Sequence, residues 1–286
     1  MRDILTLREI GAEAVEDILT LSERDDLGTP LGGSGVALVF AKPSARTRNS
    51  MEIAVAQLGG HPLHIQGDEV GIGSRETAED VARTLACYHK VIAARVSDHA
   101  HLVHMAAATD VPVLNMLSDT DHPLQGLADL LTIRQLVGRL EGARVAYVGD
   151  GNNNVARSLA EGCALTGARL TIASPEEFQL AAPPEGVRQV VNPAEAVAGA
   201  QIVYTDVWVS MGQDEDTARR NAGLAPYQVD EALMALAGDA WFMHCLPARR
   251  GEEVEAAVID GPRSAVWRQA ANRMHTARGA LAWMLG

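Results

Sequence analysis

Short apolar runs alternate with segments of helical periodicity along the first half of the chain, and this alternation limits the folds that the chain can adopt. The apolar runs lie at 36–40, 91–94 and 111–116, and a further short strand is predicted at 61–66. Segments with apolar residues at helical spacing lie between them, at 51–58, 77–88 and 99–109. The runs are short and bounded by turn residues, which is typical of buried strands. The order predicts a mostly parallel sheet with right-handed crossovers.

The same alternation restarts in the second half of the chain. Further strands are predicted at 145–148, 169–173, 202–205 and 241–243, and long helices at 123–137 and 266–285. The sequence therefore predicts an α/β protein with two doubly wound domains, mostly parallel sheets and long linking helices. We expect a first domain over residues 1–134, with the C-terminal helix 267–286 packing back on it, and a second domain over residues 135–266.

The segment from Phe40 to Ser50, F-A-K-P-S-A-R-T-R-N-S, lies at a predicted strand-to-helix turn. The first N–H groups of a helix lack partners, and the helix dipole favours negative charge there. Two guanidinium groups and two hydroxyl groups add donors, so the segment predicts an anion site with phosphate as its natural ligand. Ser and Thr are also ordinary helix caps, and an R-x-R pair is often a solvated surface. On this segment alone the two interpretations are evenly balanced.

Polar residues also follow the next two strands of the predicted sheet. Arg95 comes directly after the strand at 91–94, and His122 and Gln125 follow the strand at 111–116 after a short loop. In open α/β sheets the ligand crevice lies outside the carboxyl ends of the strands. We therefore expect these side chains to lie at the same edge as the segment around Ser44.

The turn G-D-G-N-N-N after the strand at 145–148 begins like a dinucleotide-binding fingerprint. Asn154 stands where the third glycine is needed, and no acid ends the next strand, so a Rossmann oxidoreductase is disfavoured. Asparagine side chains suit a small polar ligand better. After later strands, Asp206 could bind an ammonium group, whereas a lone cysteine such as Cys245 is more often inert packing.

Composition excludes several classes of function. A net charge of −13 and a pI near 5.1 argue against binding to nucleic acid or anionic membranes. The three cysteines lack the spacing of a disulfide framework or a structural zinc site, which fits a reducing cytoplasm. Acids interrupt the first ten residues, so we expect no signal peptide, and no apolar run reaches membrane-spanning length.

Four motifs, in order along nearly the whole chain, resemble those of the aspartate/ornithine carbamoyltransferase family. S-A-R-T-R resembles the S-T-R-T-R phosphate motif of the family, and H-P-L-Q resembles its H-P-x-Q. D-V-W-V-S-M-G and H-C-L-P look like the ornithine branch. Two departures are local. Ala45 replaces the usual Thr, which puts one phosphate contact in doubt, and Leu124 replaces a commoner small or polar residue.

The resemblance implies a role for individual residues. Those expected to bind carbamoyl phosphate are Ser44, Ala45, Arg46, Thr47, Arg95, His122, Gln125, Cys245, Leu246 and Arg273. Those expected to bind ornithine are Asn154, with its register uncertain by one, and Asp206, Ser210 and Met211. The resemblance implies catalytic roles for Arg46, Arg95, His122 and Cys245.

The implied reaction is transfer of the carbamoyl group from carbamoyl phosphate to the δ-amino group of L-ornithine, giving citrulline and phosphate. Neither a metal ion nor an organic cofactor is expected. The attacking amine must lose a proton, and both Cys245 and the phosphate are candidates to take it. The resemblance also implies a homotrimer. Two alternatives stay open: a carbamoyltransferase for another amine, such as putrescine or an N-acylated ornithine, and a non-catalytic relative.

Overall fold

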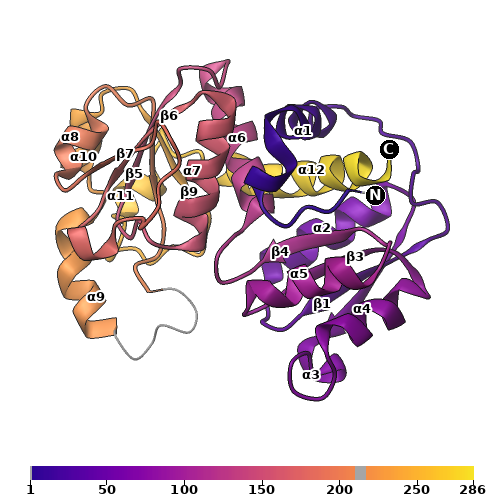
Figure 1. Ribbon diagram of the computed structural model, residues 1–286. Helices are drawn as coiled ribbons and strands as arrows, with labels where there is room; N and C mark the ends of the chain where they lie inside the picture. Colours follow the sequence, from indigo (N-terminus) through magenta and orange to yellow (C-terminus); the bar gives the residue numbers. More distant parts are fainter. Residues whose placement is uncertain (1, 210–216) are drawn as a thin grey trace. The chain divides into compact units, whose positions relative to one another are not determined.

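The chain folds into two compact units, each built on one parallel sheet. The computed structural model describes residues 2–209 and 217–286. Unit 1 comprises Met1–Ala128 and Asn272–Gly286, and unit 2 comprises Asp129–Ala271. The division falls within two long helices, α6 (Pro123–Val137) and α12 (Val266–Leu285) (Figure 1). The predicted fold class, α/β with two mostly parallel sheets, is confirmed.

The sheet of unit 1 has the strand order β2-β1-β3-β4, and all of its pairs are parallel. Its strands are β1 (Gly35–Phe40), β2 (His61–Gln66), β3 (His89–Arg95) and β4 (Val113–Leu117). Its helices are α1 (Leu7–Ser22), α2 (Ala45–Gln57), α3 (Gly67–Val70), α4 (Ala78–Ala86) and α5 (His99–Ala108), besides parts of α6 and α12. Phe40 pairs with Arg95, and Arg95 pairs with Leu117. The carboxyl ends of β1, β3 and β4 are therefore level with one another.

The core of unit 1 lies between one face of this sheet and two helices. Ala37 and Val39 of β1 share a buried cluster with residues of β3, α4 and α5. Val81 and Leu85 come from α4, one turn apart, so the apolar face of that helix covers the sheet. Because alternate residues of a buried strand point to opposite faces, both faces of β1 need apolar side chains, and its run G-V-A-L-V-F supplies them.

The sheet of unit 2 has the strand order β7-β6-β5-β8-β9, again with parallel pairs. Its strands are β5 (Arg144–Val148), β6 (Arg169–Ala173), β7 (Arg188–Val190), β8 (Ile202–Thr205) and β9 (Trp241–His244). Its helices include α7 (Asn154–Thr166), α8 (Pro193–Val197), α9 (Thr217–Leu224), α10 (Glu231–Leu236), α11 (Ala256–Ile259) and the 3₁₀ turns η1 (Glu176–Phe178) and η3 (Ala225–Tyr227). The strand order reverses at β5, and such a switch point is where α/β sheets bind ligands.

One face of the unit 2 sheet packs against short helices and the other presents tyrosines. Val203 and Phe242 belong to a buried cluster with residues of α8, α10 and α11. On the neighbouring strands β5 and β8, Tyr147 and Tyr204 stack with ring centroids 5.6 Å apart, and both are fully buried. Buried tyrosines need partners for their hydroxyl groups, so polar side chains must enter this part of the interior.

Three sequence predictions differ from the observed elements. The apolar spacing of Val15, Ile18 and Leu19 predicts a first helix over 11–27, but the helix spans Leu7–Ser22, because Thr6 caps it by accepting a hydrogen bond from the Glu9 N–H. Gly11 interrupts this helix with a φ of 80°. The segment 67–76 is rich in glycine and charge, which predicts a surface loop, but it contains the one-turn helix α3, where the Gln66 N–H donates to Glu69. The short elements β7, α8, α9, α10 and α11 were not predicted.

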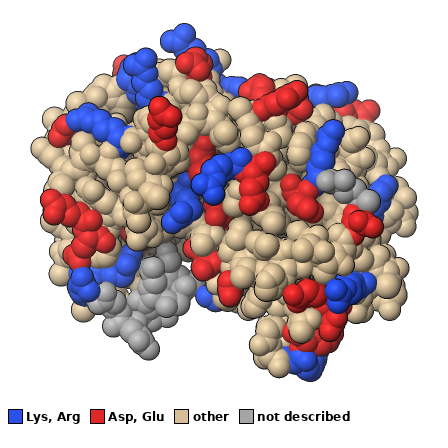
Figure 2. Space-filling model, in the orientation of Figure 1, with Lys and Arg blue, Asp and Glu red and all other residues tan. Residues whose placement is uncertain are grey.

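The surface carries charges of both signs. On the face drawn in Figure 2, basic and acidic side chains are interspersed, and the described residues form no broad basic patch there. This distribution agrees with the acidic net charge of −13. Within residues 2–209 and 217–286, no helix has the length and apolar character needed to cross a membrane.

Candidate active site

Helix α2 begins at the carboxyl end of β1 with a polar cap. The Ser44 hydroxyl accepts a hydrogen bond from the Thr47 N–H at 3.3 Å and donates to Thr47 Oγ1 at 3.1 Å. The first turn of α2 contains no acidic residue, so nothing within it offsets the positive end of the helix dipole. Ser44 is half-buried, Thr47 is buried, and Ala45 and Arg46 are exposed. The start of α2 is therefore a polar helix terminus at the predicted place, and its role in binding an anion stays a prediction.

Arg273 of α12 connects three of the predicted site residues in unit 1. Its Nη1 donates to Gln125 Oε1 and lies 3.4 Å from His122 Nε2, and its Nη2 donates to Thr47 Oγ1 at 3.0 Å. All four side chains are buried. The planar guanidinium fork can make these contacts at once, which an ammonium group could not do with the same geometry.

Arg95, the last residue of β3, brings a second buried guanidinium group to this edge. Its side chain is only 4% exposed, and its Nε has no hydrogen-bond partner among the described residues. Burial, followed by the positive charges of Arg273 and Arg46, lowers the pKa of Arg95 to about 10. The guanidinium group stays charged at neutral pH. A bound anion would relieve this crowding of like charges and provide acceptors for buried donors.

His122 is neutral in this environment. Burial and the positive charges of Arg273 and Arg95 lower its pKa well below 6.5. Because the Arg273 guanidinium can only donate, His122 Nε2 is the acceptor in their 3.4 Å contact, and the imidazole proton lies on Nδ1. We predict that Ser44, Arg46, Thr47, Arg95, His122, Gln125 and Arg273 together bind an anion, and we refer to them as the anion site.

A cavity of about 770 Å³ lies beside the anion site, within unit 1. It is lined by the start of α2, including Ser44 and Ala45, and by His64 and Gln66 of the edge strand β2. Arg48 in its wall forms an ion pair with Glu52 at 2.8 Å. The cavity therefore lies between the start of α2 and the edge strand β2.

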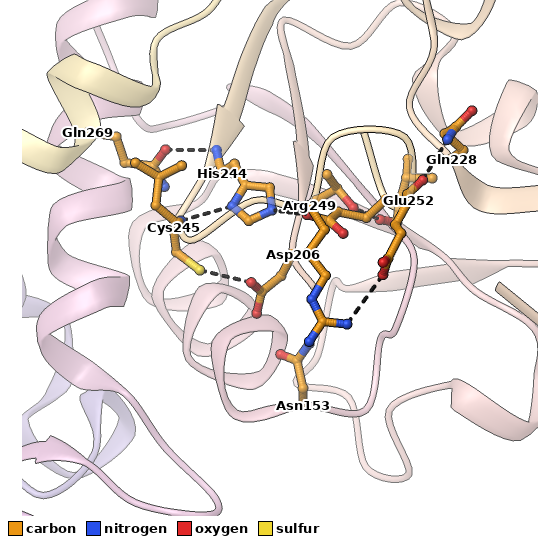
Figure 3. A network of polar contacts seen from close by, with 12 residues as sticks. Asn153, Asp206, Gln228, His244, Cys245, Arg249, Glu252 and Gln269 are labelled. Carbon is orange, nitrogen blue, oxygen red and sulfur yellow. Dashed lines mark hydrogen bonds and ion pairs between the residues drawn. The ribbon is translucent and has the colours of Figure 1, made fainter. Parts of the chain in front are cut away.

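In unit 2, the ends of β8 and β9 bring a carboxylate and a thiol together. Cys245 Sγ donates to Asp206 Oδ1 at 3.0 Å (Figure 3). Thr205 pairs with His244 in the parallel register of these strands, so the residues that follow each strand emerge side by side. Asp206 is buried and Cys245 is half-buried. We refer to this pair as the thiol site.

The turn after β5 uses one of its three asparagines to hold the fold. Asn153 caps α7 by accepting from the Ala156 N–H at 2.8 Å, and its Nδ2 donates to Tyr147 Oη and to the Asp150 carbonyl. Asn154 begins α7 and is half-buried. Since the Asn153 amide is occupied internally, Asn154 stays the asparagine that we predict to contact substrate.

Several buried polar residues near the thiol site were not singled out from the sequence. Asp150 forms an ion pair with Arg220, whose Nε also donates to the Trp208 carbonyl at 2.8 Å. Burial raises the pKa of Asp150 to about 6 although Arg220 opposes the shift. Asp129 accepts hydrogen bonds from Gln269 and Tyr204. An acid inside the apolar stretch G-L-A-D-L-L was the one signal that could have indicated Asp129.

Two predicted residues cannot be compared with the structure. Ser210 and Met211 lie outside the described residues. The predicted assignments of individual residues to the two substrates stay predictions.

Asp206, His244 and Cys245 are the one group of potential metal ligands found within the described ranges, with ligand atoms within 4.8 Å of one another. These residue types can bind zinc. His244 Nδ1, however, accepts from the Leu246 N–H at 2.8 Å, and its Nε2 lies 3.2 Å from Glu253 Oε1. A metal ion would have to displace one of these contacts, so the cluster is built as a hydrogen-bonded group. The expected absence of a metal cofactor stays a prediction.

Comparison with known proteins places both units in one family. Residues 2–135 match the carbamoyl-P binding domain of aspartate/ornithine carbamoyltransferases, and residues 141–284 match the Asp/Orn binding domain. The ornithine carbamoyltransferase of Hyperthermus butylicus is 47% identical over 99% of this chain and 97% of its own length.

Two further relatives come from Pyrococcus furiosus. Its anabolic ornithine carbamoyltransferase is 42% identical over 100% of this chain and 96% of its own length. A solved structure of ornithine carbamoyltransferase from this organism has a TM-score of 0.92 and 40% identity, covering 98% of this chain and 96% of that one. The order of the motifs, the parallel sheets and these full-length matches agree, and the chain belongs to the aspartate/ornithine carbamoyltransferase family.

Proposed function

We infer that this chain transfers the carbamoyl group from carbamoyl phosphate to the δ-amino group of L-ornithine, giving L-citrulline and phosphate. The full-length relatives are named for this activity. The observation that carries the inference is the buried Arg273 fork that joins Thr47, His122 and Gln125. It gathers polar groups from α2, from the start of α6 and from α12 at one place. The relative named anabolic supports a role in arginine biosynthesis.

We propose that the anion site binds carbamoyl phosphate. The terminus of α2, with Ser44 and Thr47, takes the phosphate group and the charge that grows on it as it leaves. Arg95 supports this role because it is a buried cation with an unused Nε donor. Arg46 is exposed at the start of α2, where it can close on the phosphate from the solvent side.

The carbonyl oxygen of carbamoyl phosphate needs donors, since it becomes an oxyanion when the amine attacks. His122 supports this role because its low pKa keeps the ring neutral, with one N–H, on Nδ1, available to donate. Arg95 and Arg46 add positive charge at the same edge. A well-placed donor of this kind lowers the barrier by about 3–4 kcal/mol.

The thiol site is proposed to receive ornithine. The δ-ammonium group titrates near pH 10 in water, so one proton must leave before the nitrogen can attack. The Cys245 thiol and the Asp206 carboxylate lie 3.0 Å apart, so an ammonium group beside one also lies beside the other. Asp206 is predicted to hold the α-amino group, and Cys245 beside it, as a thiolate, or the phosphate of the second substrate takes the proton of the δ-ammonium group. The nitrogen lone pair forms the new bond to carbon, and the carbon–oxygen bond to phosphate breaks.

Purified protein with carbamoyl phosphate and L-ornithine, and with no added metal, tests this function. We expect citrulline and phosphate to form in equal amounts. Arg46→Ala should abolish turnover while the protein stays folded, and Asp206→Asn should mainly weaken ornithine binding. Putrescine and N-acetylornithine, offered in place of ornithine, test the other amines. Citrulline formation at the normal rate by Arg46→Ala would remove that residue from the site.

We also propose that the chain forms a homotrimer and acts in the cytoplasm. Exposed apolar side chains in unit 1, Ile53 on α2 and Leu63 on β2, support burial of this face by another copy. The three cysteines are present as thiols, which supports a reducing compartment. Light scattering coupled to size-exclusion chromatography measures the assembly directly, and a monomeric mass would contradict the proposal.

A further inference from the structure

The turn after β9 contains a residue in an unfavourable backbone conformation. Leu246 has a φ of 59°, in the left-handed region that side chains other than glycine rarely adopt. Its side chain packs against the buried cluster of unit 2, so it cannot simply rotate outward. Such a conformation persists only where surrounding contacts hold it. Leu246 directly follows Cys245, so whatever holds Leu246 also fixes the thiol.

The His244 imidazole makes the contact that holds this turn. Its Nδ1 accepts a hydrogen bond from the Leu246 N–H at 2.8 Å. Because Nδ1 is an acceptor, a neutral ring carries its proton on Nε2, which lies 3.2 Å from Glu253 Oε1. The same carboxylate oxygen accepts from the Arg249 N–H at 2.5 Å. His244 and Glu253 are both fully buried, and their contacts link both ends of the turn.

The backbone of His244 is held from the other side. Its N–H donates to Gln269 Oε1 at 2.9 Å. Gln269 Nε2 donates in turn to Asp129 Oδ1 at 2.7 Å and lies 3.1 Å from the hydroxyl of Tyr204. These side chains are buried, so the network has little freedom to rearrange. The ring of His244 therefore has a fixed base from which to position the turn.

We propose that His244 is a positioning residue of the reaction: its ring, set in one tautomer by Glu253, holds the Leu246 peptide and so keeps the Cys245 thiol against Asp206. This role rests on the proposed function, but its contacts can be tested without turnover. His244 does not itself contact the reacting atoms. Its loss should move the thiol and lower kcat, while the hydrogen bonds of Arg273 within the anion site of unit 1 should not change.

Two substitutions separate the two ring contacts. In His244→Asn, the side-chain oxygen stands near the position of Nδ1 and can still accept from the Leu246 N–H. In His244→Gln, the amide reaches toward Glu253 but leaves no acceptor at the δ position. Both remove a buried ring, so they serve as controls for each other. We expect kcat to fall about 100-fold in His244→Gln, the loss typical of a misplaced group, and much less in His244→Asn.

Alkylation of Cys245 by iodoacetamide reports the position of the thiol independently of activity. The experiment uses the Cys87→Ser protein, because Cys87 is exposed whereas Cys163 is buried. We expect His244→Gln to react about tenfold faster than the parent, because the turn that half-buries the thiol is no longer held. His244→Asn should react at nearly the parent rate. Glu253→Gln keeps an oxygen acceptor and should also match the parent.

The outcomes are distinct. The proposal is overturned if all variants are alkylated at the same rate. It is also overturned if His244→Asn and His244→Gln lose kcat and unfolding midpoint equally, because the ring then has a packing role only. If His244→Gln does not fold, Glu253→Ala replaces it, since the ring then loses its partner, and fast alkylation is again expected. Absence of citrulline formation by the parent protein would reject the proposed function, whereas the alkylation rates would still decide the role of His244.

Discussion

Arg95 and Arg273 show how single residues make an anion site in a protein of negative net charge. Both guanidinium groups are buried, and each lies close enough to lower the pKa of His122. Removing a cation from water costs free energy unless an opposite charge compensates it. These residues therefore destabilise the empty site and favour a bound dianion. The short range of this attraction lets it act despite the net charge of −13.

Replacing Arg273 by lysine tests the guanidinium fork. Lysine keeps the charge but cannot contact Thr47, His122 and Gln125 in the same geometry. We expect kcat/KM for carbamoyl phosphate to fall by about 100-fold or more, with the KM for ornithine little changed. Steady-state kinetics with each substrate varied in turn measures this. Arg278→Lys on the same helix is the matched control, and an equal effect there would contradict the role of Arg273.

Asp150 gives stability a dependence on pH. Its folded-state pKa of about 6 lies above the usual value near 4, because of burial, so the folded protein holds the proton more tightly than the unfolded chain. The stability gained from proton binding by Asp150 is fully present below about pH 4. It decreases as pH rises to about 6, and the total loss in free energy of unfolding is up to roughly 3 kcal/mol. Asp150→Asn should lack this slope.

Urea unfolding of the parent and of Asp150→Asn between pH 4.5 and 7.5 checks this expectation. As pH rises, the free energy of unfolding of the parent should fall relative to that of Asp150→Asn. The difference between the two should become constant above about pH 6.5. A difference that does not change with pH would show that Arg220 keeps the carboxylate ionised throughout this range.

Among the elements, α12 depends on a glycine for its packing. A Cβ on Gly279 would lie 2.7 Å from the Ile18 carbonyl oxygen of α1 and would also meet the Ser22 side chain. Helix propensity alone would make Gly279→Ala stabilising by up to about 1 kcal/mol. Crowding against α1 should instead destabilise unit 1 by about 1–3 kcal/mol.

The sign of the change in free energy of unfolding of Gly279→Ala therefore shows whether helix propensity or crowding against α1 dominates. Circular dichroism during urea unfolding measures it, with Gly286→Ala as control, because a Cβ there meets only an ordinary contact at 3.6 Å. A stabilised Gly279→Ala variant would show that α1 moves away from α12 at little cost.

The longer elements could be predicted from sequence, and the shortest could not. Helices α6 and α12 and strands β2, β6 and β8 have the predicted limits, because their apolar patterns extend over a whole element. Helices of four to six residues such as α8, α10 and α11 are too short to show a period of 3.6 residues. The edge strand β7 has only three residues.

The site was predictable only as far as motifs at strand ends allow. Strand ends place Ser44, Arg95 and His122 at one edge. The contact between Arg273 and His122, however, joins residues 151 positions apart, and no local pattern encodes it. The same holds for the pair of Asp206 and Cys245, 39 positions apart. Such contacts follow from packing of the whole unit.

At the scale of the whole molecule, the two units differ in how the chain builds them. Unit 2 is one continuous segment, whereas unit 1 needs residues from both ends of the chain. The C-terminal segment of unit 1, Asn272–Gly286, carries Arg273 and also Arg278, which donates to the Arg24 carbonyl. The integrity of unit 1 therefore depends on a segment that follows unit 2.

Ending the chain after Ala271 should affect unit 1 alone. We expect amide hydrogen exchange to become faster throughout residues 2–128, with loss of carbamoyl phosphate binding, because α1 loses its packing partner. Protection in the strands of unit 2 should persist. Mass-spectrometric hydrogen exchange on both proteins makes the comparison, and equal loss of protection in both units would show that they unfold as one.

The placement of Arg273 after unit 2 also has a consequence for synthesis. On the ribosome, residues 2–128 emerge well before residues 272–286, so the guanidinium group that joins Thr47, His122 and Gln125 arrives only after unit 2 has been synthesised. A nascent chain thus lacks the contacts of Arg273 until unit 2 has emerged. We therefore expect the anion site to be assembled only in chains that already contain both units.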